Sequence, residues 1–273
     1  IDLMKYAGGI GLDTAVTTNG YLLDEEKIKD SMRAGTGRFA ISLDAVGDNF
    51  DKIRGVKGAY KKVINTCEIL SQYKRAGKVE VHLYFTLMKN TLSVYKDVFA
   101  MARKFDFPLV VNLFDNTPYF FADLKGAEHK FWIDENHSYE LKNFQKFIIE
   151  EKEKNDSSIY HTYSEIEYFR KYFKDSLQKG IPCSVSQKRL GIDSQGNVYG
   201  GCWSMGIFGS LKRNTLKNIV NSAEYKNAHK DMFFKKCPGC SCGYTTNLRH
   251  SASVMAKELM LRLAPSLRKK IYA

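Results

Sequence analysis

Five of the six cysteines lie in the last third of the chain, and this clustering restricts the possible folds more than any other feature. Cys183 and Cys202 flank one short segment, whereas Cys237, Cys240 and Cys242 follow together in a single run. Disulfides need an oxidising compartment, and nothing in the sequence points to secretion. Because clustered cysteines in such a chain are first of all metal ligands, we expect a metal centre here.

A β-hairpin is predicted between Cys183 and Cys202. Strand patterns at 190–193 and 197–199 lie on either side of a turn that contains Gly196. A hairpin brings its two ends together, so both thiolates can reach one point even though they are far apart in the sequence.

The run Cys237-Pro-Gly-Cys240-Ser-Cys242 supplies the remaining thiolates. Pro and Gly favour a tight turn whose amide N–H groups point at sulfur, as in zinc sites and iron–sulfur clusters. Zinc ribbons usually have two Cys-x-x-Cys knuckles, and only one pair here has that spacing. The spacing therefore favours an iron–sulfur cluster on Cys183, Cys202, Cys237 and Cys240, with structural zinc as the alternative and Cys242 as a spare or substitute ligand.

The first half alternates strand and helix patterns up to residue 114. This order and spacing predict parallel strands joined by crossover helices. Asp24 is a predicted helix N-cap, and Gly35 and Gly77 are predicted to follow helix ends. We expect strands at 13–18, 38–45, 79–88 and 109–114, and helices at 24–35, 60–75 and 92–105.

The pattern becomes irregular after Asp115. Residues 117–134 are rich in aromatic side chains, and we interpret them as a loop or insertion over one end of the sheet. Within it, Trp132 either shapes a substrate pocket or packs in the core. Further helices are expected at 140–154, 164–178, 215–227 and 251–273, the last with a break at Pro265.

The chain carries a formal net charge of +12, which favours anionic partners. It has no recognition-helix signature and no RNA-binding sheet signature, so we do not expect it to bind nucleic acid. No apolar run reaches the roughly 18 residues that a membrane span needs, and no signal peptide opens the chain. We expect a cytoplasmic protein without membrane contact.

The second half resembles a known type of domain. The stretch from Ile181-Pro-Cys183 through Gly191-Ile-Asp-Ser-Gln-Gly196 and Cys202 to Cys237-Pro-Gly-Cys240 resembles the SPASM/twitch auxiliary-cluster domains of radical S-adenosylmethionine (SAM) enzymes. The segment from Gly209-Ser-Leu-Lys to Ser222 resembles the helix entry that those domains place between their two cysteine pairs.

The first half resembles the partial barrel of the same superfamily. Thr17-Thr18-Asn19-Gly20 is similar to its third strand, Ile41-Ser42-Leu43-Asp44-Ala45 to its fourth, and Asp51-Lys-Ile-Arg54-Gly55 to the loop that follows. The resemblance implies an α/β fold with a partial (βα) barrel at 1–180 and a small α+β cysteine-rich SPASM/twitch domain with a helical tail at 181–273. The C-x-x-x-C-x-x-C motif of the SAM-cleaving cluster is absent, which we interpret as missing N-terminal sequence.

The resemblance also implies cofactors and site residues. Asn19, Ser42, Asp44 and Arg54 would bind SAM, since barrel sites lie at the carboxyl ends of strands. Turn formation is the alternative role for Asn19, and loop capping for Asp44. The cysteines would hold one auxiliary 4Fe–4S cluster, and a second 4Fe–4S cluster is expected only in the full-length protein.

Two hypotheses about function follow. The first is a radical SAM oxidoreductase or maturase, inactive alone as this fragment, that acts on a peptide or small polar substrate. Its substrate would be anionic, and a reductant protein such as flavodoxin or ferredoxin would supply its electrons. The second is a non-catalytic binding module stabilised by zinc or by a cluster.

Overall fold

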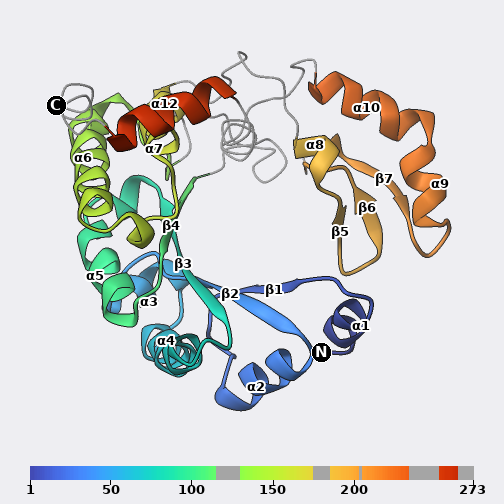
Figure 1. Cartoon of the computed structure of the whole chain (residues 1–273), viewed down its shortest axis with the longest axis horizontal. Helices are drawn as coiled ribbons and strands as arrows, with labels where there is room; N and C mark the ends of the chain where they lie inside the picture. Colours follow the sequence, from blue (N-terminus) through green and yellow to red (C-terminus); the bar gives the residue numbers. More distant parts are fainter. Residues whose placement is uncertain (115–129, 175–184, 203–204, 234–251, 264–273) are drawn as a thin grey trace. The chain divides into compact units, whose positions relative to one another are not determined.

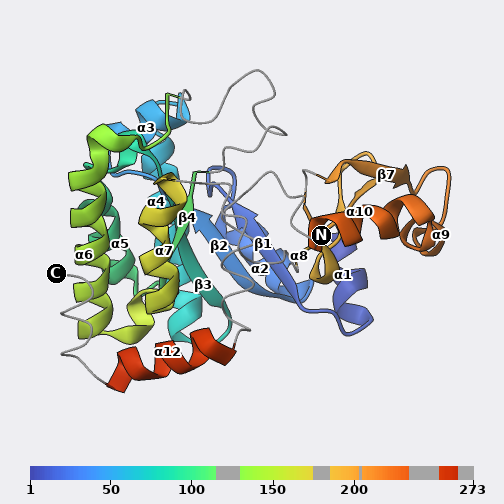
Figure 2. The same cartoon turned by 90° about the horizontal axis from the view of Figure 1, so that it is seen from above.

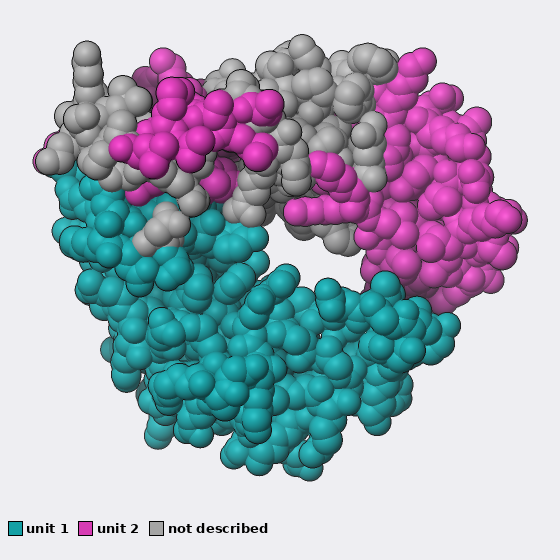
Figure 3. All heavy atoms as spheres, viewed as in Figure 1, with its two compact units in different colours: residues 1–113, 146–161 teal, residues 114–145, 162–273 magenta. Residues whose placement is uncertain are grey.

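The computed structural model describes residues 1–114, 130–174, 185–202, 205–233 and 252–263 (Figure 1). The chain forms two compact units, drawn in different colours in Figure 3. The first unit contains residues 1–113 and 146–161, and the second contains residues 114–145 and 162–273. The domain boundary expected between residues 180 and 181 stays a prediction.

The first unit is built on a parallel sheet of four strands whose spatial order is their order in the sequence (Figure 1). This arrangement confirms the predicted α/β fold. The sheet is extended by residues 159–161, since Ile159 bridges to Leu109 in parallel and the Tyr160 N–H donates to the Leu109 carbonyl (3.0 Å). The strands are β1 (Thr14–Thr18), β2 (Thr36–Ser42), β3 (Glu80–Leu87) and β4 (Leu109–Leu113).

Crossover helices connect the strands and cover the apolar face of the sheet (Figures 1 and 2). Phe39, Ile41, Leu83 and Phe85 of that face are fully buried. They alternate along their strands with more polar residues of the opposite face, as the period of two requires. The helices are α2 (Glu25–Arg33), α4 (Ala59–Arg75) and α5 (Tyr95–Phe105), and α1 (Asp2–Gly9) precedes β1.

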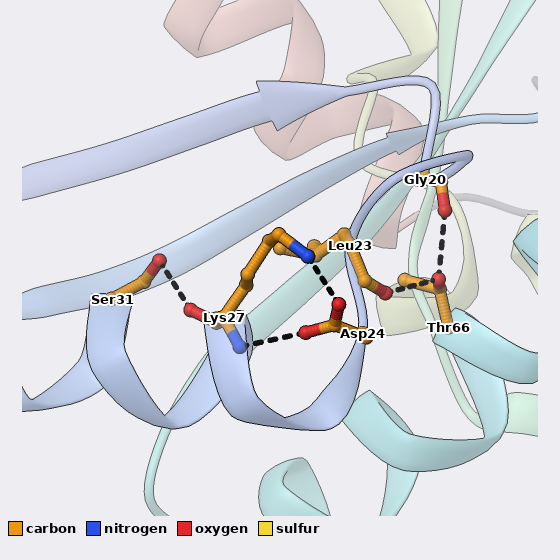
Figure 4. Close-up of polar contacts among 6 residues, drawn as sticks. All are labelled: Gly20, Leu23, Asp24, Lys27, Ser31 and Thr66. Atoms are coloured by element: carbon orange, nitrogen blue, oxygen red, sulfur yellow. Dashed lines mark hydrogen bonds and ion pairs between the residues drawn. The ribbon is translucent and has the colours of Figure 1, made fainter.

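The loop between β1 and α2 is tightly held (Figure 4). Asp24 is the N-cap of α2 as predicted, because its Oδ1 accepts a hydrogen bond from the Lys27 N–H (2.9 Å). The buried Thr66 hydroxyl of α4 lies 2.9 Å from the carbonyl oxygen of Gly20 and 2.8 Å from that of Leu23. The loop is therefore attached both to α2, which follows it in the sequence, and to α4, which contributes Thr66.

Gly20→Ala is expected to lower the free energy of unfolding by about 3 kcal/mol. Gly20 has a φ of 72°, and an added Cβ would lie 2.8 Å from the Val63 Cγ2, so left-handed strain and overpacking add together. Gly77→Ala is the matched control: φ is 68° there with open space around the new Cβ, and we expect a loss of about 1 kcal/mol. Urea unfolding measures the free energy of unfolding of both variants. Equal decreases in the two variants would contradict the argument that the Gly20 position is overpacked.

The structure differs from the sequence predictions at two places in this unit. Residues 51–55, expected as a loop, belong largely to helix α3 (Asp48–Arg54), which ends at Gly55 in the left-handed conformation. Helix α5 begins at Tyr95 rather than Leu92, because the 3₁₀ turn η1 (Lys89–Thr91) comes first. In that turn the Thr91 hydroxyl accepts from the Met88 N–H, which competes with a helical start.

The second unit contains an aromatic core. Trp132 is buried, with its ring centroid 5.5 Å from that of Tyr172 and 5.1 Å from that of Phe173. The Tyr172 hydroxyl donates to the Phe114 carbonyl (2.9 Å). Trp132 therefore packs in a core, although its ring also borders a cavity. The helices here are α7 (Tyr163–Lys174), α8 (Val185–Lys188) and α12 (Ala252–Leu263), and α6 (Ser138–Lys154) belongs partly to each unit.

The predicted hairpin is confirmed and belongs to a three-stranded antiparallel sheet, β5 (Gly191–Ile192), β6 (Asn197–Tyr199) and β7 (Ile207–Ser210). The segment from Gly209 to Ser222, expected as the entry into a helix, starts at the end of strand β7 and contains helix α9 (Leu216–Asn221). The helix expected at 215–227 is two helices, α9 and α10 (Ala223–Phe233). They are separated because Ser222 is extended, with a ψ of 151°.

None of the helices in the described part of the chain combines the length and apolar character needed to cross a bilayer.

Candidate cofactor sites

One face of the four-stranded sheet is polar and partly exposed. Ser42 at the end of β2 pairs in register with Tyr84 of β3, and Thr86 pairs with Asn112 of β4. Register partners point to the same face of a sheet, and so do residues two apart in a strand. These four side chains therefore line one face near the carboxyl ends of three strands, and each is half-buried or exposed.

Asp44 connects this face to the segments around it. Its side chain is buried, its Oδ1 accepts from the Thr86 backbone N–H (2.8 Å), and its Oδ2 lies 2.8 Å from Arg54 Nη2. The Arg54 guanidinium lies 5.2 Å from the ring centroid of Phe50. Two of the predicted site residues are thus brought together, and Arg54 lies in the last turn of α3 rather than in a loop. Asp44 fastens the end of β2 to both β3 and α3.

Two polar groups at this edge have no hydrogen-bond partner among the described residues. One is the buried Arg54 Nε, which can only donate. The other is the hydroxyl of the half-buried Ser42, for which the described residues show no hydrogen bond. SAM offers carboxylate and hydroxyl oxygens that can accept and hydroxyl groups that can donate. The chemistry of Ser42 and Arg54 therefore fits a cofactor of this kind.

Asn19 lies directly after β1 and is exposed. Its Oδ1 accepts from the Tyr21 N–H (3.1 Å), which is the turn-forming role of an Asx residue. This contact uses only the Oδ1 of Asn19, and its amide nitrogen can still donate to a cofactor. The cofactor role expected for Asn19 therefore stays a prediction.

Most of the predicted metal ligands, Cys183, Cys237, Cys240 and Cys242, lie outside the described residues. Cys202 is described: it follows β6 as a free, half-buried thiol. Within the described ranges, no group of three or more His, Cys, Asp or Glu side chains could hold a metal ion. The ligand set therefore stays a prediction.

Cys67 differs from Cys202 in its surroundings. It is fully buried in α4, and burial raises the pKa of its thiol to about 12. A thiol that stays protonated is a poor metal ligand. Cys67 is a packing residue, as its apolar helical neighbourhood indicates.

The hairpin of the second unit is held by Asp193. Its Oδ1 accepts from the backbone N–H groups of Gln195 (2.8 Å) and Asn197 (2.9 Å). Its Oδ2 accepts from the Asn197 side-chain amide (2.9 Å) and the Tyr199 hydroxyl (3.2 Å). One carboxylate thus organises the turn that leads into the cysteine after β6.

These donors lower the pKa of Asp193 from its ordinary value of 3.8, with the Asn197 side-chain hydrogen bond as the largest cause. A carboxylate with a lowered folded-state pKa stabilises the fold above its unfolded pKa, and the contribution is lost as the pH falls through the folded pKa. We expect Asp193→Asn to lower the melting temperature of the metal-free protein at about pH 7, with the difference closing below about pH 4. An equal difference at about pH 3 would contradict this role.

Tyr84 was not among the predicted site residues, although it lies beside Ser42 on the polar face. Buried and less buried residues alternate in residues 80–87, and this pattern is the signal that could have identified it. Tyr84 lies between the buried Leu83 and Phe85 and two positions before Thr86. It therefore faces the same way as Thr86.

Comparison with known families identifies both halves of the chain. Residues 2–114 match the sequence profile of the radical SAM superfamily. Residues 183–243 match the profile of SPASM, an iron–sulfur cluster-binding domain.

Three characterised proteins align with part of the chain. The AdoMet-dependent heme synthase of Oleidesulfovibrio alaskensis is 33% identical over 103 residues, which is 37% of this chain and 26% of that protein. The Fe-coproporphyrin III synthase of Methanosarcina barkeri is 28% identical over 109 residues, 40% of this chain and 26% of that protein. The PqqA peptide cyclase of Gluconobacter oxydans is 27% identical over 105 residues, 38% of this chain and 28% of that protein. The chain spans about a quarter of the length of each of these relatives.

Solved structures share the fold. Native anSMEcpe with bound AdoMet and Cp18Cys peptide has a TM-score of 0.62 at 20% identity, covering 98% of this chain and 79% of that chain. SuiB of Streptococcus suis bound to S-adenosylmethionine has a TM-score of 0.57 at 13% identity, covering 93% of this chain and 60% of that chain. Residues 2–114, which contain the parallel sheet, therefore form a radical SAM region, and residues 183–243 form a SPASM iron–sulfur cluster-binding domain.

Proposed function

We propose that the intact protein is a radical SAM oxidoreductase or maturase that modifies a peptide with the help of an auxiliary 4Fe–4S cluster. The observation that carries this proposal is the combination, in one chain, of a parallel sheet with a polar face and a SPASM domain. When bound, SAM and its cluster supply one-electron chemistry that removes a hydrogen atom from carbon. The protein supplies binding, orientation and a dry environment.

SAM binds at the carboxyl edge of the sheet in this proposal. The Ser42 hydroxyl and the Arg54 Nε offer polar contacts to the cofactor, and Asn19 lies at the end of the neighbouring strand. Asp44 holds Arg54 and the start of the loop in place, so that the contacts are organised before the cofactor arrives. The side chains of Tyr84 and Thr86 continue the same face toward the substrate.

The auxiliary cluster is proposed to lie on Cys183, Cys202, Cys237 and Cys240, with Cys242 as the substitute for Cys240. The free, half-buried thiol of Cys202 supports its place in this set. Thiolates are the usual ligands of such clusters, and four of them need a cation to offset their mutual repulsion. A flavodoxin- or ferredoxin-like protein would supply the electrons, in the cytoplasm.

A peptide is the favoured substrate. The name of the PqqA peptide cyclase and the peptide bound to anSMEcpe both support this class, and the +12 net charge favours an acidic peptide. Two other relatives are named as synthases of iron tetrapyrroles, which makes an iron porphyrin the second candidate substrate. A small polar molecule is the remaining candidate.

Anaerobic reconstitution with iron and sulfide tests the cofactors. We expect about four irons per chain for the auxiliary cluster, with absorbance near roughly 400 nm. Equilibrium dialysis with labelled SAM, carried out on the reconstituted chain and on the Ser42→Ala variant, tests the cofactor edge. Zinc without iron, together with no SAM retention, would instead support a non-catalytic binding module.

The substrate class is tested separately with spectroscopy. Titration of the reconstituted protein with an iron porphyrin is expected to leave the Soret band of the porphyrin unchanged. A shifted Soret band that saturates at one porphyrin per chain would favour the tetrapyrrole candidate.

A further inference from the structure

A groove of about 540 Å³ lies between the loop after β1 and the start of α4 in the first unit. One wall is apolar and consists of Tyr21, Leu22 and Leu23, and the other carries Lys61 and Lys62. Asp24 and Lys27 also line the groove, but they form an ion pair with each other. Figure 4 shows the loop on its Leu23 side, where Thr66 attaches it to α4. The groove is separate from the residues assigned to SAM, apart from Asn19 at the beginning of the same loop.

The apolar wall is rigid although it faces solvent. Leu22 is 72% exposed, yet the loop around it is held by the Thr66 hydroxyl, whose single hydrogen is shared between the carbonyl oxygens of Gly20 and Leu23. Packing of Gly20 against Val63 adds a further restraint. An exposed leucine on a restrained loop loses little conformational entropy when a partner covers it, which is the property of a preorganised binding surface.

The lysine wall carries two positive charges. Lys61 and Lys62 lie in the first turn of α4, which has no acidic residue of its own. The Asp51 carboxylate accepts from the Gly58 and Tyr60 N–H groups at this helix end (2.5 and 2.7 Å) and offsets part of the positive end of the helix dipole. Neither lysine forms an ion pair within the described residues. By contrast, Lys27 and Lys29 of α2 pair with Asp24 and Glu25.

A cation–π contact holds the Lys62 side chain beside the groove. Its Nζ lies 5.1 Å from the ring centroid of Tyr21, which holds the ammonium group beside the apolar wall. The groove therefore places unpaired positive charge next to exposed apolar surface. An anion that also offers an aliphatic side chain uses both walls, whereas inorganic phosphate uses only the lysines.

We propose that this groove binds an acidic segment of the peptide substrate, with its carboxylates at Lys61 and Lys62 and an aliphatic side chain against Leu22. The inference rests on the proposed peptide substrate and adds a docking site to it. Two neighbouring lysines without an ion pair among the described residues are explained by such a partner, because bound carboxylates would offset their charges.

The probe is a dansyl-labelled peptide, Gly-Glu-Leu-Glu-Glu-Leu-Gly, added to the reconstituted full chain and followed by fluorescence anisotropy at low salt. The Lys61→Glu/Lys62→Glu variant is expected to bind it about tenfold more weakly, because attraction becomes repulsion at two sites. Leu22→Ala is expected to weaken binding about threefold. A peptide with Gln in place of each Glu should bind weakly to all forms.

The matched control is Lys5→Glu/Lys217→Glu, which changes the net charge equally at exposed lysines outside the groove. It should leave peptide binding within about twofold of the wild type. The melting temperature of the groove variant is measured beside that of the control, and equal values show that a loss of binding comes from the groove and not from unfolding. Equal weakening by both double variants would overturn the proposal.

Two further outcomes separate this inference from the proposed function. If iron and SAM are retained but the groove variant binds the peptide normally, the groove assignment is wrong and the radical SAM proposal stands. If inorganic phosphate displaces the peptide more strongly than sodium chloride of equal ionic strength, the groove is a phosphate site and the peptide assignment is overturned.

Discussion

Replacing Cys202 with alanine is expected to remove the auxiliary cluster and reduce bound iron from about four atoms per chain to nearly none. Cys202 is a free thiol placed directly after β6, and the hairpin before it is held by Asp193. The proposed set keeps three thiolates, and Cys242 is proposed as a substitute for its neighbour Cys240 and not for Cys202, so one iron is left without a protein ligand and the cluster is exposed to loss. Iron analysis and the visible spectrum after anaerobic reconstitution measure the change.

Cys67→Ala is the matched control for this experiment. Cys67 is the other free cysteine of the described chain, and burial raises its pKa to about 12. Its replacement should keep the full iron content while lowering the free energy of unfolding by about 1 kcal/mol, since it empties a small part of the core. Unchanged iron in the Cys202 variant would show that the cluster uses other ligands.

Replacing Asp44 with alanine is expected to lower the free energy of unfolding by about 2 to 3 kcal/mol and to abolish SAM retention. The variant leaves Arg54 without its buried partner and the Thr86 N–H without its acceptor. Breaking a buried ion pair is costly, and the partial exposure of Arg54 reduces the loss. Urea unfolding measures the stability, and equilibrium dialysis with labelled SAM measures the binding.

Glu80→Ala provides the comparison for Asp44. Glu80 also pairs with an arginine, Arg38, at 2.8 Å, but both side chains are more than half exposed. Such an exposed ion pair contributes little to stability. The free energy of unfolding should therefore fall by no more than about 0.5 kcal/mol, and SAM binding should not change. If Asp44→Ala and Glu80→Ala behave alike, Asp44 does not organise the cofactor edge.

Local signals in the sequence predicted the elements of the first unit well. Apolar side chains alternate with more polar ones in residues 80–87, and apolar residues recur with a helical period in residues 60–75. These patterns identified β3 and α4 to within one residue at most boundaries. Asp24 was recognised as an N-cap, and the structure confirms it through the Lys27 N–H. These features depend on neighbours close in sequence, which is why the sequence reveals them.

The errors concern the ends of helices. Residues 215–227 were expected to form one helix, but Ser222 is extended and separates α9 from α10. Arg54 was expected in a loop, but it ends a helix and reaches back to Asp44. In both cases the sequence pattern missed where a helix ends.

The amino-acid sequence by itself determined the order of strands and helices, the hairpin before Cys202 and the family resemblance, because periodicity, turn residues and cysteine spacing are local properties. Only the tertiary structure decided that Asp44 meets Arg54 and the Thr86 N–H, and that Lys61 and Lys62 face the exposed Leu22 across a groove. Those contacts arise where parallel strands end at a common edge and where a crossover helix returns beside an earlier loop. Their geometry depends on packing between segments that the sequence keeps apart.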